Sequence, residues 1–146
     1  MNKSWIANGF TAANALFGGL SIMMSISGEY HVAAICILIA MAADAFDGRV
    51  ARALGTAGPM GVELDSLSDD ISFGVAAGAL MYSYQLRELG AFGFIPCALL
   101  GAFCAFRLAR FNVKVTSVHG YFEGLPCPTV GVIIACYVLS GVKIWN

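Results

Sequence analysis

The chain alternates between long uncharged stretches and short polar segments. Four stretches without Asp, Glu, Lys or Arg cover residues 4–28, 71–86, 89–106 and 124–142, and a fifth, 30–43, runs directly into a charged segment. A membrane-spanning α-helix needs roughly 20 predominantly apolar residues. The pattern therefore predicts an all-α, polytopic transmembrane helix bundle with five spans, at residues 9–27, 31–52, 61–86, 89–110 and 125–144.

A cleaved signal peptide is the alternative interpretation of the first stretch. Lys3 precedes this stretch, and the small-residue sequence Ser25-Ile26-Ser27 lies near its end. A signal peptide is normally followed by a soluble domain, whereas the later stretches here are just as apolar. We therefore interpret the first stretch as a span.

Composition supports a membrane protein and excludes other classes. Only 12% of the residues are charged, against about 25% in soluble domains. The net charge is −1 and no basic cluster is present, so nucleic-acid binding has no support. The five cysteines contain no Cys-x2-Cys pair and predict neither a disulfide framework nor a zinc site. Cys127, between two prolines, has no clear interpretation at this stage.

The distribution of basic residues predicts the orientation. Under the five-span threading, Arg87 and Lys143 fall on one side of the membrane. The other side carries Lys3, Arg49, Arg52, Arg107, Arg110 and Lys114. By the positive-inside rule this second side is cytoplasmic. We therefore expect an integral protein of the cytoplasmic membrane whose polar site faces the cytoplasm.

Four aspartates lie in or beside the second and third predicted spans, where a carboxylate costs about 2.5–3.5 kcal/mol near the bilayer centre. At 100° per residue, one stripe of the second span holds Asp44, Asp47, Gly48 and Ala51, and one stripe of the third holds Gly61, Asp65, Asp69 and Ser72. If the two stripes face each other, four carboxylates converge. Carboxylate oxygens favour hard ions, so the pattern predicts a site for two divalent cations, Mg²⁺ or Mn²⁺.

Other interpretations of these aspartates remain open. They could form an intramembrane salt-bridge network with Arg49 and Arg52, although such a network needs no small residues beside the acids. They could also line the path of a divalent-cation transporter, because intramembrane acids often mark ion pathways. Glu63 and Asp70 point away from the two stripes and are excluded as ligands.

The spacing Asp44-x2-Asp47-Gly48-x2-Ala51-Arg52-x8-Gly61-x3-Asp65-x3-Asp69 resembles the signature of the CDP-alcohol phosphotransferase family. The resemblance implies a membrane enzyme that transfers a substituted phosphate from a CDP-linked donor to an alcohol and releases CMP. It also implies a two-metal site formed by the four aspartates, with Asp69 as the general base. On the same grounds, the nucleotide or donor side is assigned to Gly48, Ala51, Arg52 and Gly61.

Further segments resemble the branch of that family that makes phosphatidylserine. They are Thr11-x2-Asn14-x3-Gly18, residues 107–112 (Arg-Leu-Ala-Arg-Phe-Asn) and residues 124–128 (Gly-Leu-Pro-Cys-Pro). The expected reaction transfers the phosphatidyl group of CDP-diacylglycerol to L-serine. The same chemistry with glycerol 3-phosphate or inositol phosphate as acceptor is the alternative.

The predicted acceptor- or diphosphate-binding residues are Arg107, Arg110, Asn14, Asn112 and Ser72. A guanidinium suits a carboxylate or a phosphate, and the sequence does not decide which of the two each arginine binds. Both arginines could instead mark the membrane edge, and the asparagines could instead cap helix ends.

The resemblance also carries expectations about the whole protein. The family usually has about six spans, so residues 1–146 are expected to form a single domain that lacks its last span, and a catalytically inactive fragment is the third alternative. A homodimer is expected from the family alone.

Overall fold

The computed structural model describes residues 4–54, 58–114 and 126–144 of the chain. Every regular element in these ranges is helical, and no strand occurs among them. The elements in chain order are α1 (Ser4–Ile26), α2 (Tyr30–Leu54), α3 (Pro59–Asp69), the π-helix η1 (Asp70–Val75), α4 (Ala76–Tyr84), the 3-10 helix η2 (Leu86–Leu89), α5 (Ala91–Lys114) and α6 (Cys127–Leu139). The all-α prediction is confirmed for the described residues.

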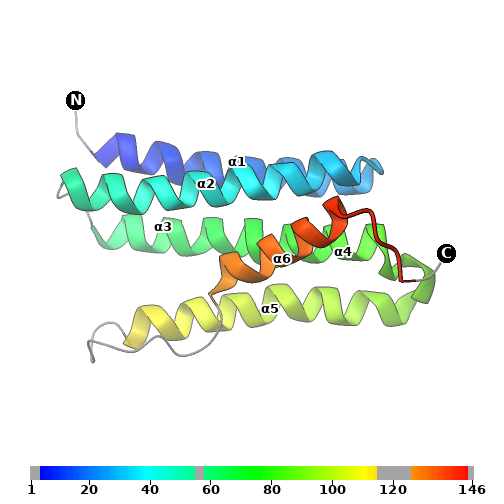
Figure 1. Cartoon of the computed structure of the whole chain (residues 1–146). Helices are drawn as coiled ribbons and strands as arrows, with labels where there is room; N and C mark the ends of the chain where they lie inside the picture. The colour runs from blue at the N-terminus through cyan, green and yellow to red at the C-terminus, as the bar shows by residue number, and fades with distance from the viewer. Residues whose placement is uncertain (1–3, 55–57, 115–125, 145–146) are drawn as a thin grey trace.

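The helices lie side by side in a bundle (Figure 1). α1 and α2 form a hairpin and share the most extensive contact between any two elements. The consecutive segments α3, η1 and α4 pack against α1 on one side and α5 on the other. α6 crosses η1 and α4 obliquely and also contacts α2. The five predicted spans correspond to α1, α2, α3–η1–α4, α5 and α6.

The third predicted span differs from a uniform α-helix in its middle. Its six residues Asp70–Val75 form the π-helix η1, directly after Asp69. A π segment changes the angle between successive side chains, and such segments frequently occur at functional sites. A pattern read at 100° per residue cannot predict this change, so the position of Ser72 relative to Asp69 depends on the structure.

The hairpin turn fixes which parts of α1 and α2 meet. Gly28 has a φ of +84°, a backbone conformation that residues other than glycine rarely adopt. The Glu29 N–H donates to the Met24 carbonyl at 2.9 Å across the turn. Because the two helices then run antiparallel, the first half of α1 lies beside the second half of α2, which carries Asp44 and Asp47.

The core is built largely from small residues. Ala33, Ala34 and Ala40 of α2 and Ala76 and Ala77 of α4 are fully buried. Such residues let helix backbones approach closely, which is how helices associate where no water drives their packing. The result is a tightly packed bundle in which the aspartates of α2 and α3 are held by rigid elements.

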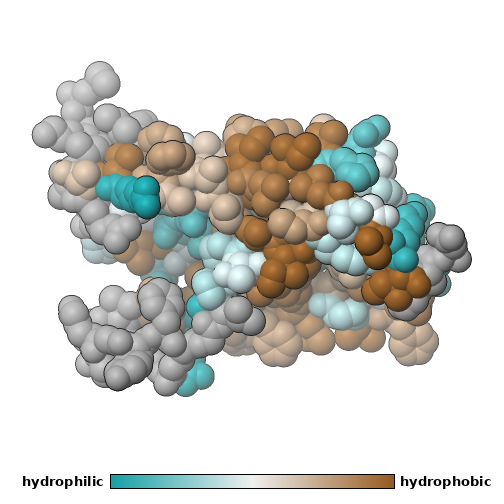
Figure 2. Space-filling view, in the orientation of Figure 1, coloured by the Kyte–Doolittle hydropathy of each residue, from teal (hydrophilic) through white to brown (hydrophobic). Residues whose placement is uncertain are grey.

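The outer surface suits a lipid environment. Within the described residues, three helices are long and apolar enough to cross a membrane, over Asn8–Ile26, Tyr30–Val50 and Ala91–Val113, and a shorter apolar helix covers Cys127–Leu139. On α5, Phe92, Phe103 and Phe106 are 80%, 66% and 75% exposed. Figure 2 shows apolar residues over the middle of the visible face and hydrophilic residues toward the two ends. These features fit a polytopic membrane protein.

Candidate carboxylate metal centre

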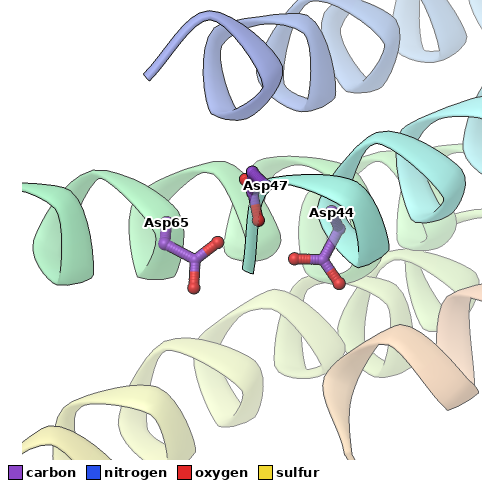
Figure 3. Close-up of side chains that lie close together, drawn as sticks. All are labelled: Asp44, Asp47 and Asp65. Atoms are coloured by element: carbon purple, nitrogen blue, oxygen red, sulfur yellow. The ribbon is translucent and has the colours of Figure 1, made fainter. Parts of the chain in front are cut away.

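Three of the four predicted aspartates converge. Asp44 and Asp47 project from α2 and Asp65 projects from α3, and one carboxylate oxygen from each lies within 4.8 Å of the others. Figure 3 shows the three side chains close together where the two helices meet. Asp47 is buried, whereas Asp44 and Asp65 are half-buried. The two stripes identified in the sequence therefore face each other in the fold.

Asp69 lies beside this group rather than within it. Its side chain is 8% exposed, and its Oδ1 accepts a hydrogen bond from Asn14 Nδ2 at 3.1 Å. Asp44 interacts through its side chain with both Asp65 and Asp69. Asp44, which is one of the three converging residues, thus connects Asp69 to this group.

The first helix orients carboxylates from both halves of the motif. Thr11 Oγ1 donates to Asp47 Oδ2 at 2.8 Å, and Asn14 donates to Asp69. Ser72 Oγ in turn donates to the backbone carbonyl of Asn14 at 2.9 Å. The face of α1 that carries Thr11 and Asn14 therefore contacts the site.

Of the four residues assigned to the donor side, the structure describes the surroundings of Gly61 and Gly48 but not the side chains of Ala51 and Arg52. Gly61 is half-buried, and a Cβ added there would meet nothing within 4 Å. Packing within the described residues therefore does not require glycine at this position, and space remains beside α3. Gly48 is half-buried on α2. Ala51 and Arg52 lie in the last turns of α2, but their side chains fall outside the part that the structure describes.

Three polar residues near the end of α5 differ in their exposure and in their hydrogen bonds. Arg107 Nη1 donates to Cys127 Sγ at 3.5 Å, and its Nε is buried without a hydrogen-bond partner. Arg110 is exposed. Asn112 Nδ2 donates to Ser66 Oγ at 3.0 Å and so connects α5 to the residue after Asp65.

These contacts bear on two alternatives, namely that the asparagines cap helix ends and that the aspartates pair with arginines in a salt-bridge network. Asn14 lies inside α1 and Asn112 inside α5, and the side chain of each donates to a residue of α3. Arg49 is exposed, and among the described side chains no ion pair joins it to the four aspartates. Glu63 is exposed, and Asp70 is not among the three converging carboxylates.

The donor set fits a divalent cation. Asp65 Oδ1 is buried and has no hydrogen-bond partner among the described residues, although unpaired buried carboxylate oxygens are costly. Three carboxylates this close repel each other unless a cation lies among them or one of them takes up a proton. Oxygen-only ligand sets are typical of Mg²⁺ and Mn²⁺.

The aspartates could be identified from the sequence, but the hydrogen-bond partner of Thr11 and the position of residues 121–125 could not. Thr11 was noted only as part of a motif, and its partner is Asp47, 36 positions away. Residues 121–125, which precede α6 and include part of the Gly-Leu-Pro-Cys-Pro motif, lie outside the described residues.

Similarity to known proteins agrees with this geometry. The chain is 38% identical to the CDP-diacylglycerol–serine O-phosphatidyltransferase of Helicobacter pylori (strain ATCC 700392 / 26695), over 90% of this chain and 56% of that protein. It is 38% identical to the Bacillus subtilis (strain 168) protein of the same name, over 85% of this chain and 70% of that protein. It is 40% identical to the archaetidylserine synthase of Methanothermobacter thermautotrophicus, over 88% of this chain and 55% of that protein.

The chain thus spans about half the length of most of these relatives. No solved structure matches it. The pattern that defines the CDP-alcohol phosphatidyltransferase family matches residues 4–145, which include the converging aspartates, the α1 face that orients them and the arginine-bearing end of α5. The chain belongs to the CDP-alcohol phosphatidyltransferase family.

Proposed function

We propose that this protein transfers the phosphatidyl group of CDP-diacylglycerol to the hydroxyl group of L-serine, giving phosphatidylserine and CMP. The observation that carries the proposal is the convergence of Asp44, Asp47 and Asp65 within 4.8 Å, in a chain of this family. The names of the Helicobacter and Bacillus relatives support serine as the acceptor.

Two divalent cations, Mg²⁺ or Mn²⁺, would be held by Asp44, Asp47, Asp65 and Asp69. Bound there, the ions supply charge neutralisation for the donor's diphosphate and for the departing CMP. Thr11 and Asn14 hold Asp47 and Asp69 in fixed orientations, and such supporting hydrogen bonds are a regular feature of metal sites.

The chain's own residues would carry the remaining steps. Asp69 accepts the proton of the serine hydroxyl as that oxygen attacks the β-phosphorus, and the bond from this phosphorus to the oxygen of CMP breaks. The Asn14 amide, which donates to Asp69 Oδ1, keeps this carboxylate oriented for that role. Arg107, whose Nε has no partner, is suited to bind the carboxylate of serine or a phosphate of the donor.

The nucleotide side of the donor would lie along Gly48, Ala51, Arg52 and Gly61. The open space beside Gly61 supports this placement, since a ligand can approach the backbone closely where no side chain intervenes. CDP-diacylglycerol would enter from the bilayer and serine from the cytoplasm, because the positive-inside rule places this end of the bundle in the cytoplasm. A homodimer remains a prediction from the family resemblance.

The test is CMP release by the purified protein in detergent, with CDP-diacylglycerol and Mn²⁺ or Mg²⁺, with and without L-serine. We expect serine-dependent release that Asp69→Asn lowers by at least about 100-fold, in line with the usual contribution of a general base. Asp70→Asn is the matched control, because it makes the same change at the next residue, whose side chain interacts with Cys104 and not with Asp44. Equal loss in both variants would remove the assigned role of Asp69.

The alternatives have distinct outcomes in the same assay. Release that requires glycerol 3-phosphate or inositol phosphate instead of serine would keep the mechanism and change the acceptor. Metal flux into sealed vesicles without any CDP-lipid, combined with no CMP release, would favour a cation transporter.

A further inference from the structure

A second group of reactive side chains lies outside the carboxylate site, where the first residue of α6 meets α5. Cys127 Sγ lies 3.9 Å from the backbone oxygen of Cys104, and Arg107 donates to Cys127 at 3.5 Å. Cys104 and Cys127 are 6% and 5% exposed, and both are free thiols.

The two cysteines lie next to each other. Both line the same cavity, and Cys127 Sγ reaches the backbone oxygen of Cys104, although the residues belong to different helices and are 23 positions apart. Two adjacent thiols form a chelating pair for soft, thiophilic atoms. The first thiol to react brings the second to a high effective concentration, which strengthens binding by a factor of about 100 or more.

A cavity of about 120 Å³ lies next to this pair. Both cysteines and Arg107 line it, and the rest of its wall is formed by Phe73, Leu100, Phe103 and Val130. An apolar cavity of about 150 Å³ can hold benzene, so this one is of the right scale for a single aromatic ring. Cys36, Cys97 and Cys136 do not line it.

We propose that Cys104 and Cys127 form a binding site for aryl compounds of trivalent arsenic, with the arsenic atom on the two sulfur atoms and the aryl ring in the cavity. An aryl arsonous acid, R–As(OH)₂, reacts with two thiols to give R–As(S-Cys)₂ and two water molecules. Two As–S bonds form, two As–O bonds break, the thiol protons leave in the water, and no atom changes its oxidation state. The two cysteines have no role in the proposed function, so this site goes beyond it, although Arg107, which is suited to bind substrate, also lines the cavity.

The test is titration of the reduced full-length chain in detergent with phenylarsine oxide, followed by intact-mass spectrometry. We expect one arsenical per chain, released by 2,3-dimercaptopropanol but not by a monothiol. Cys104→Ala and Cys127→Ala should each weaken binding by at least about 100-fold. Cys97→Ala on α5 and Cys136→Ala on α6 are the matched controls and should bind as the wild type does.

A further variant keeps the test valid if Cys104→Ala or Cys127→Ala fails to fold. A chain in which only Cys36, Cys97 and Cys136 are replaced by alanine retains the pair and should still bind one arsenical. No binding to the wild type, or equal binding after either cysteine of the pair is removed, would overturn the proposal. Because the readout is mass, it does not depend on which acceptor the enzyme uses.

Discussion

Among the converging carboxylates, Asp65 gives the strongest argument that the site is suited to a cation. Its Oδ1 is buried without a hydrogen-bond partner, and oxygens of Asp44 and Asp47 lie within 4.8 Å. Asp47 differs because it accepts a hydrogen bond from Thr11. Asp47 is therefore held by a hydrogen bond that Asp65 Oδ1 lacks. This hydrogen bond can be removed with little change in shape by replacing Thr11 with valine.

Thr11→Val is expected to raise the metal concentration needed for half-maximal CMP release by about 10- to 100-fold. Valine keeps the shape of threonine but removes the hydrogen bond to Asp47, and losing such a supporting contact typically costs that much metal affinity. Titration of Mg²⁺ or Mn²⁺ in the CMP-release assay measures the change. Thr11→Ser keeps the hydroxyl and should restore near-normal metal dependence.

Ser21→Ala is the matched control for this substitution. Ser21 is fully buried on the same helix, and its hydroxyl has no hydrogen-bond partner. If Ser21→Ala shifted the metal dependence as much as Thr11→Val, the effect would come from the packing of α1 and not from Asp47.

At the level of elements, α1 acts as the support of the site. Its residues contact α2 through Thr11 and the α3–η1 segment through Asn14. This arrangement requires close approach, which Gly18 allows. A Cβ at Gly18 would lie 2.9 Å from the Cα of Ser72 and would also clash with its hydroxyl. The contact between α1 and η1 therefore depends on a single glycine.

Gly18→Ala is expected to destabilise the protein by about 1–3 kcal/mol, the usual cost of forcing extra atoms into a packed contact. The midpoint of thermal unfolding in detergent should fall. Gly19→Ala provides the comparison, because a Cβ there meets nothing within 4 Å and alanine is the better helix former by about 1 kcal/mol. A midpoint for Gly18→Ala equal to or above that of Gly19→Ala would contradict the packing argument.

For the whole molecule, the two ends of the bundle are chemically different. The converging aspartates lie toward the end where α2 finishes and α3 begins, while η2 lies at the other end of the α3–η1–α4 segment (Figure 1). Among exposed acids, Glu63 marks the first end and Glu88 marks the second. These two positions can therefore report the orientation in the membrane.

In a variant whose five cysteines are replaced by alanine, Glu63→Cys should react with a membrane-impermeant maleimide only from the cytoplasmic side. Glu88→Cys should react only from the opposite side. The positive-inside rule is the physical reason, since basic residues are retained in the cytoplasm. Labelling in inside-out and right-side-out vesicles measures this, and the reverse pattern would place the carboxylate site outside the cytoplasm.

The sequence by itself determined the helical class, the approximate spans and the two helix stripes that carry the aspartates. These follow from local rules: apolar length sets a span, and 3.6 residues per turn places positions three and four apart on one face. The close match of α2 to the predicted span 31–52 shows how far such rules reach.

Only the tertiary structure decided which side chains meet across the bundle. The π-helix after Asp69 is seen only in the structure. The way the helices cross decides the hydrogen bonds from Thr11 to Asp47 and from Asn14 to Asp69, and the contact between Cys104 and Cys127. Their partners are 23 to 55 positions apart, and no local periodicity relates them. Packing of small residues sets those crossings, because it fixes how closely and at what angle two helices approach.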